Sequence, residues 1–203
     1  MLLRLRSGQA FIDTLATRTD SVQLTRAIRV ASVVFLTALT AAAAQISIPL
    51  PFTEVPFTFQ PMVVLVGGLA LGPRLAVASQ VLYLAAGMAG LPVFAASATL
   101  PPGIGRLFGP TGGYLMSYPL AAFVVGYLGA RGLDRRYLTS VLSMLAGLAI
   151  VFAGGVLWLS LLVGPQAALA TGFYPFVIAD VAKVLAAAGI MPGVWTLLRR
   201  RDD

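Results

Sequence analysis

Two ionisable residues, Asp180 and Lys183, stand three positions apart inside an apolar run long enough to cross a bilayer. On a helix this spacing places both side chains on one face, where they can pair with each other or share a ligand. A charged residue near the centre of a membrane helix costs about 2.5–3.5 kcal/mol, so its surroundings must offset that cost. A structural ion pair between helices would do so, and so would a binding site. We favour a binding site, because ionisable residues inside membranes are functional as a rule.

The composition predicts an all-α integral membrane protein of one domain. Of the 203 residues, 59% are hydrophobic and only 10% are charged. The chain has neither Cys nor His, so we expect no metal site and no resident cofactor. The net charge of +7 comes from arginines beside the apolar segments, which membrane topology and anionic lipids explain better than nucleic acid does.

Six apolar segments predict six transmembrane helices, at about residues 28–48, 61–71, 75–90, 114–130, 137–163 and 168–198. Prolines in 49–60 exclude a continuous helix there, and 91–112 is a long connection without a helical pattern. We expect 1–26 to be a cytoplasmic or interfacial N-terminal segment and 27–203 to be the six-helix domain. A cleaved signal peptide is a poorer interpretation, because the polar lead-in is too long and the apolar run continues to Ile48.

Twelve arginines fall on one side of this six-span arrangement, whereas only Arg106 falls in the loops on the other side. The positive-inside rule then places both termini in the cytoplasm. Seven helical residues, about 10 Å of rise, separate Asp180 from Phe173 near the outer end of the sixth span. The acid–base pair therefore lies in the outer half of the membrane, on the side of the loops 49–60 and 91–112. This arrangement is suited to capturing a solute from outside.

No glycine-rich loop ending in Gly-Lys-Ser/Thr is present, so we expect no ATP hydrolysis and no other enzymatic activity by this chain. Arg106 is either a ligand for an anion or a residue held at the lipid headgroups. Ala38 and Ala42 have the four-residue spacing that lets helices approach closely, which serves internal packing or the docking of a partner.

Four stretches are similar to the BioY family of biotin transporters. They are AQISIPLPF (44–52) with VPFTFQ (55–60), LALGPRL (69–75), LYLAAG (82–87) with GLPVF (90–94), and LFGPTGGY (107–114). Asp180 and Lys183 fall where the family's sixth-span pair is expected. Glu54 departs from the pattern, since another proline is common there, and the docking register could be Val34 and Ala38 instead of Ala38 and Ala42.

The resemblance implies a six-helix substrate-binding (S) component of an energy-coupling factor transporter in the bacterial inner (cell) membrane. Such a component captures biotin from outside and associates with a transmembrane coupling subunit and ATPase subunits. We expect the binding site to include the pair Asp180 and Lys183, together with Arg106 and Gln60.

The chemistry of biotin fits these residue types. Its ureido ring has two N–H donors and a carbonyl acceptor, which a neighbouring carboxylate and ammonium would match. Its valerate carboxylate suits Arg106 or Lys183. Its apolar ring and chain need apolar walls, for which the candidates are Phe52, Phe57, Tyr83 and Tyr114.

Two other functions stay open at the level of sequence. One is an S component for another small vitamin, and the other is a proton-coupled secondary carrier that uses Asp180. An intramembrane enzyme is disfavoured by the lack of His, of Cys and of a second intramembrane acid.

Overall fold

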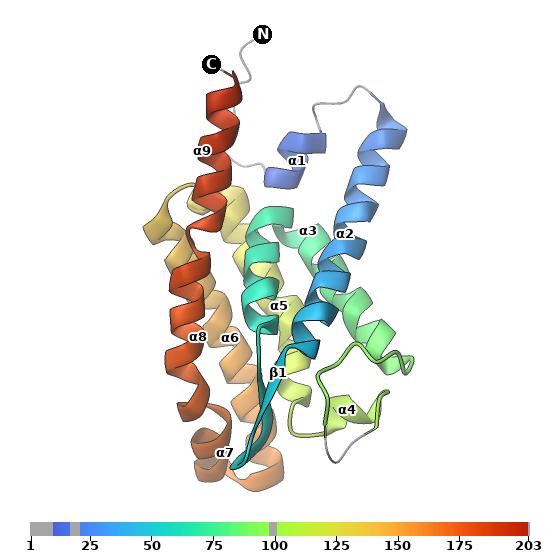
Figure 1. The fold of residues 1–203 in the computed structure, drawn as a ribbon, viewed down its shortest axis with the longest axis vertical. Helices are drawn as coiled ribbons and strands as arrows, with labels where there is room; N and C mark the ends of the chain where they lie inside the picture. Colours follow the sequence, from blue (N-terminus) through green and yellow to red (C-terminus); the bar gives the residue numbers. More distant parts are fainter. Residues whose placement is uncertain (1–9, 17–20, 98–100, 203) are drawn as a thin grey trace.

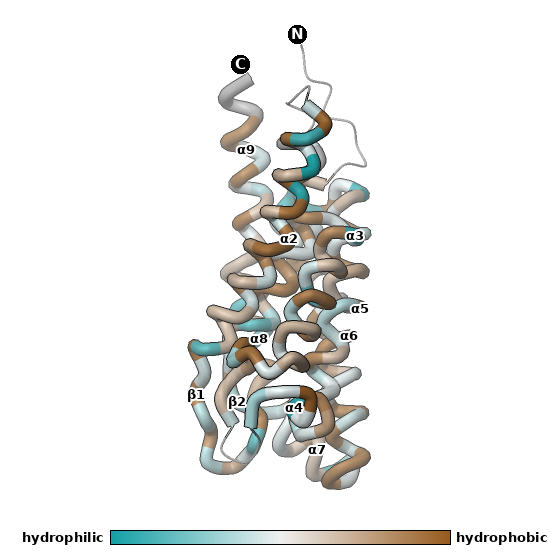
Figure 2. Tube along the Cα trace, turned by 90° about the vertical axis from the view of Figure 1, so that its right-hand side faces the viewer, coloured by the Kyte–Doolittle hydropathy of each residue, from teal (hydrophilic) through white to brown (hydrophobic). Residues whose placement is uncertain are grey.

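The computed structural model describes residues 10–16, 21–97 and 101–202. In this part of the chain, five helical segments are long and apolar enough to cross a membrane. The chain is thus a multi-pass membrane protein built from an elongated helix bundle (Figure 1). Hydrophilic residues gather at the first turns of α2, whereas the middles of the helices are mostly apolar (Figure 2).

The elements in chain order are α1 (Phe11–Ala16), α2 (Val22–Gln45), β1 (Ser47–Leu50), β2 (Thr53–Thr58), α3 (Gln60–Met88), α4 (Gly105–Phe108), α5 (Gly112–Leu128), the single π-helical turn η1 (Gly129–Leu133), α6 (Tyr137–Val163), α7 (Pro165–Gly172), α8 (Tyr174–Ala187) and α9 (Ile190–Asp202). The core forms where α5 lies between α3 and α6 and contacts both.

The first span begins earlier than predicted, at Val22, because Ser21 caps it. The Ser21 hydroxyl accepts a hydrogen bond from the backbone N–H of Leu24 at 3.3 Å and so satisfies one free donor of the first turn. The expected domain boundary at 26–27 falls inside this helix. Of the expected N-terminal segment 1–26, residues 1–9 and 17–20 lie outside the described residues, whereas Phe11–Ala16 form the short helix α1.

Gly72 divides α3 into two arms. Its φ of 73° and ψ of 174° are outside the helical region and favour glycine, and Pro73 follows at once. The first arm runs to one end of the molecule and the second arm returns from it (Figure 1). These arms are the predicted second and third spans, so the six-span arrangement holds with two spans joined at a kink. The start of α2 and the end of α9 accordingly lie at the same end of the molecule (Figure 1).

The proline-rich segment after the first span forms an antiparallel hairpin, which the sequence analysis did not predict. β1 pairs with β2 in the register Ser47↔Thr58, Ile48↔Phe57 and Leu50↔Thr53. The hairpin lies at the end of the bundle opposite the start of α2, with β2 against α7 (Figure 1).

The predicted sixth span, 168–198, was wrong at its start. Residues 165–172 form the separate helix α7, and the spanning segment begins at Tyr174. Phe173, with φ −120° and ψ −64°, breaks the helix, and Pro175 lies in the new first turn, where its missing N–H is not needed.

Candidate functional site

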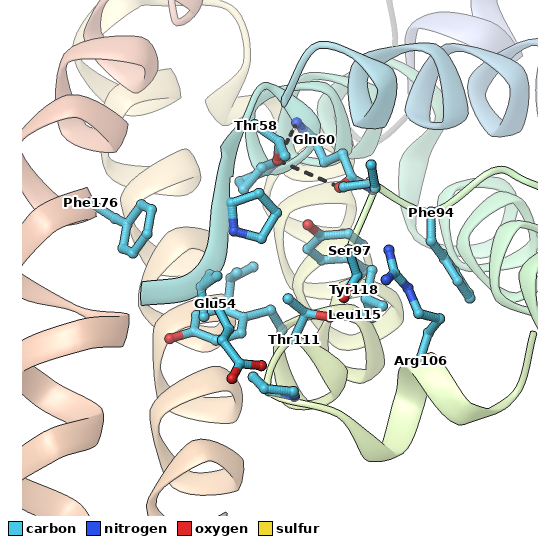
Figure 3. A pocket seen from close by; sticks show the side chains of 18 of the residues that line it. Glu54, Thr58, Gln60, Phe94, Ser97, Arg106, Thr111, Leu115, Tyr118 and Phe176 are labelled. Atoms are coloured by element: carbon cyan, nitrogen blue, oxygen red, sulfur yellow. Dashed lines mark hydrogen bonds between the residues drawn. The ribbon is translucent and has the colours of Figure 1, made fainter. Parts of the chain in front are cut away.

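A pocket of about 810 Å³, which includes the space open to solvent at its mouth, lies at the hairpin end of the bundle. Its wall is assembled from β2, the start of α3, residues 94–97, α4, the start of α5, α6 and α8 (Figure 3). The loops 49–60 and 91–112, which were expected on the side of the acid–base pair, both contribute lining residues.

Asp180 lies in the wall of this pocket, and its ion-pair partner lies behind it. The Lys183 ammonium donates to Asp180 Oδ1 at 2.7 Å and to the backbone carbonyl of Thr58 at 2.6 Å. It also lies 3.5 Å from the centre of the Phe57 ring, a cation–π contact. Asp180 is 7% exposed, and Lys183 does not line the pocket. Lys183 therefore balances the charge of the carboxylate while Asp180 presents an acceptor to the pocket.

Arg106 supplies a cation to the same pocket. It belongs to the short helix α4 in the long outer loop and is only 6% exposed. Burial lowers the pKa of its guanidinium from the usual range, because desolvation disfavours the charged form. Guanidinium groups remain protonated in proteins, so Arg106 offers N–H donors suited to a carboxylate.

Gln60 and Tyr83 form a polar link behind the pocket wall. Gln60 lines the pocket and donates to the Tyr83 hydroxyl at 2.5 Å, and this hydroxyl donates to the carbonyl of Val93 at 3.2 Å. Tyr83 is fully buried and is not a lining residue. Tyr83 therefore holds Gln60 and the loop 91–112, through Val93, in position.

Tyr114 lines the pocket with its ring rather than with a free hydroxyl. The hydroxyl donates to the carbonyl of Gly172 at 2.7 Å. A Cβ on Gly155 would lie 2.1 Å from Cε1 of this ring, so only glycine leaves room for it. Tyr118, one turn further along α5, also lines the pocket.

The structure thus brings together four of the eight residues expected at the site, Asp180, Arg106, Gln60 and Tyr114. Lys183 and Phe57 lie behind the wall, and Tyr83 supports it. Phe52 is 58% exposed at the hairpin turn and does not line the pocket.

The sequence analysis missed several lining residues, notably Thr58, Ser97, Thr111, Tyr118 and Phe176. Two of them carried a usable signal, because Thr58 and Thr111 stand inside the quoted stretches 55–60 and 107–114. Tyr118 and Phe176 sit in apolar helical runs, where nothing in the sequence separates a lining residue from a packed one.

The arrangement is suited to binding a small ligand with both polar and apolar parts. It combines a carboxylate acceptor, a buried guanidinium, hydroxyl and amide groups, and apolar rings. No three acidic side chains gather within the described residues in a way that would hold a metal ion.

The two alanines expected to dock a partner lie on an open face of α2. Both Ala38 and Ala42 are exposed, as are Val34 and Phe35 beside them. The alternative of packing inside the bundle is therefore wrong for these alanines, whichever register a partner would use.

Comparisons with known proteins agree with this architecture. A solved S-component for biotin from an ECF-type ABC transporter superposes with a TM-score of 0.77 at 23% identity, covering 87% of this chain and 95% of that one. "Probable biotin transporter BioY" of Pyrococcus horikoshii is 38% identical over 80% of this chain and 93% of its own length. "Biotin transporter BioY" of Thermotoga maritima is 39% identical over 75% of this chain and 86% of its own length. The model of the BioY family matches residues 16–200. This chain belongs to the BioY family.

Proposed function

We propose that this chain captures biotin from the outer side of the membrane, as the substrate-binding component of an energy-coupling factor transporter. The observation that carries the proposal is the Asp180 carboxylate, nearly buried and charge-balanced by Lys183, in one pocket with the guanidinium of Arg106. Two relatives named as biotin transporters support the choice of ligand.

In the proposed complex, Asp180 accepts hydrogen bonds from the ureido N–H groups. Thr58 and Gln60 line the same pocket, where the Thr58 hydroxyl donates to the Gln60 side-chain carbonyl at 3.5 Å, and they add further polar groups to the site. The valerate carboxylate is bound by Arg106, because Arg106 lines the pocket, whereas Lys183 lies behind its wall. The rings of Tyr114, Tyr118 and Phe176 enclose the apolar part of the ligand.

The energising partners would be a transmembrane coupling subunit and ATPase subunits in the bacterial inner (cell) membrane. The exposed alanine face of α2 supports this, since small side chains permit close approach of another helix. The chain itself has no nucleotide-binding loop, so the proposal gives it no ATPase activity and no other enzymatic role.

Calorimetric titration of the purified chain with biotin tests the proposal. We expect saturable binding by the chain alone, without ATP or partners. An analogue in which the ureido N–H groups are methylated should bind at least tenfold more weakly, because Asp180 would then lack its donors. Saturable binding of a different vitamin, with none of biotin, would overturn the choice of ligand while keeping the transporter class.

A further inference from the structure

Glu54 is an unpaired carboxylate on the wall of the biotin pocket. It lines the pocket from β2 and is exposed, whereas Asp180 and Arg106 are both nearly buried. The salt bridge formed by Asp180 is to Lys183, and no ion pair joins Glu54 to any of the described residues. Glu54 therefore places a negative charge at the mouth of the pocket, and the proposed binding of biotin does not use this charge.

The strand β2 fixes where this charge stands relative to the polar end of the site. Four residues of β2 line the pocket, and three of them, Glu54, Pro56 and Thr58, stand at the alternate positions that share one face of a strand, whereas Val55 does not. Thr58 is 8% exposed, and its carbonyl is bound by Lys183 beside Asp180. Four residues of strand rise about 13 Å, so Glu54 lies about that far outward from Thr58. Figure 3 shows Glu54 and Thr58 at different levels of the pocket.

A ligand with its ring at Asp180 must carry a long tail to meet Glu54, and the tail must end in a group that a carboxylate attracts. We propose that the pocket also takes biotin amides whose tails end in an ammonium group, such as the amide of biotin with one amine of 1,5-diaminopentane. The amide carbonyl replaces the free carboxylate as the acceptor for Arg106, and the ammonium pairs with Glu54. This inference rests on the proposed function and adds a class of substrate to it.

The expected effect is modest, because Glu54 is exposed and its charge is screened. Exposed ion pairs change affinity by a small factor, here about threefold. The effect should shrink between 0.05 and 0.5 M salt, as the Debye length falls from about 14 Å to about 4 Å and salt screens the exposed charges more strongly. Free biotin, which is anionic, should respond in the opposite direction to removal of the Glu54 charge.

The test compares two biotin amides of 1,5-diaminopentane, one with a free terminal ammonium and one with that amine acetylated. Each is titrated into the wild type, Glu54→Gln and Glu54→Asp, with biotin as a third ligand. The ratio of the two amide affinities is the readout, so partial damage to folding in a variant cancels.

We expect the wild type and Glu54→Asp to bind the ammonium amide about threefold more tightly than the acetylated amide at low salt. In Glu54→Gln the ratio should fall to about one, while biotin binds slightly more tightly. Normal biotin binding with a wild-type ratio of one, or with the same ratio in Glu54→Gln, would overturn this inference alone. Absence of biotin binding in the wild type would overturn the proposed function and this inference with it.

Discussion

Lys183 and Arg106 carry the same charge but have different surroundings. The ammonium of Lys183 is held by Asp180, by the Thr58 carbonyl and by the Phe57 ring, behind the pocket wall. Arg106 lines the pocket from α4. The sequence left open which of the two pairs with the carboxylate of the ligand, and the geometry favours Arg106.

Biotin methyl ester distinguishes these two cations. Arg106→Gln should weaken biotin binding by about 10- to 100-fold and should erase the preference for the free acid over the ester, because its partner is then gone. Lys183→Met should weaken both ligands and keep the preference. Isothermal titration measures all four affinities. A preference lost in Lys183→Met and retained in Arg106→Gln would reverse the assignment.

Asp134 is a second buried acid, far from the pocket, in the turn between η1 and α6. Its Oδ2 accepts from the Trp195 indole N–H at 2.6 Å, and its side chain is fully buried. Burial raises the pKa of this carboxyl above its ordinary value of 3.8, although the indole bond acts in the opposite direction.

The raised pKa predicts a pH dependence of stability. Ionisation of Asp134 is harder in the folded than in the unfolded chain, so its contribution to stability falls as the pH rises from 3.8 through the raised folded pKa. Asp134→Asn keeps an acceptor for Trp195 and removes this loss. Melting temperatures in detergent, measured from pH 4 to 7.5, should fall less steeply for Asp134→Asn than for the wild type. Parallel curves would show that Asp134 does not titrate in this range.

At the scale of the element, the sequence predicted those boundaries that local chemistry sets. α6 spans Tyr137–Val163 as expected, because Gly164 at φ 85° and Pro165 end it. The turn at Gly72 and Pro73 was likewise visible. The hairpin β1–β2 was not, because prolines interrupt its strands and β2 packs against α7, more than a hundred residues away in the sequence.

The sequence predicted those site residues that are ionisable or that stand in the stretches similar to the BioY family, and it did not predict the others. Asp180 was recognisable because a charged residue inside a membrane helix is energetically costly. Arg106 was recognisable because it is the one arginine in the loops expected on the outer side. Phe52 was expected in the wall, yet it lies at the turn of the hairpin, where its side chain is exposed. Tyr83 was expected there too, and the helical turn of α3 directs it into the core instead. Such directions follow from packing, which a single sequence does not specify.

The open face of α2 gives a prediction about assembly. Ala38→Phe or Ala42→Phe should reduce co-purification with a coupling subunit several-fold and leave biotin binding intact, because a bulky ring prevents close helix contact. Ala149→Phe, at an exposed alanine of α6, is the matched control and should co-purify normally. Equal recovery of all three variants would mean that the partner docks elsewhere.

At the scale of the whole molecule, five long apolar segments give six membrane crossings, because each of the two arms of α3 counts as one crossing. The twelve-to-one division of arginines then predicts that the pocket faces outward. An outward-facing pocket implies capture from outside, so one experiment on the orientation of the bundle tests both predictions.

Reporter fusions test this orientation. A reporter fused after Asp203 and one placed between Arg131 and Arg135 should both be cytoplasmic, whereas one inserted after Pro102 should be external. Thr99, in the same loop, is expected to be external as well, but it lies outside the described residues. A reporter after Pro102 on the same side as one after Asp203 would contradict six spans.

The central claim, that the Asp180 carboxylate binds biotin in this pocket, is tested most directly by titrating biotin into purified Asp180→Asn. The change keeps the size of the side chain but removes its charge, and it leaves the Lys183 ammonium without its ion-pair partner. The account predicts a loss of affinity of about 10- to 100-fold. Asp134→Asn, the same change at a buried acid outside the pocket, should bind biotin like the wild type. Unchanged affinity in Asp180→Asn would show that the Asp180–Lys183 pair only joins structural elements, and would contradict the account.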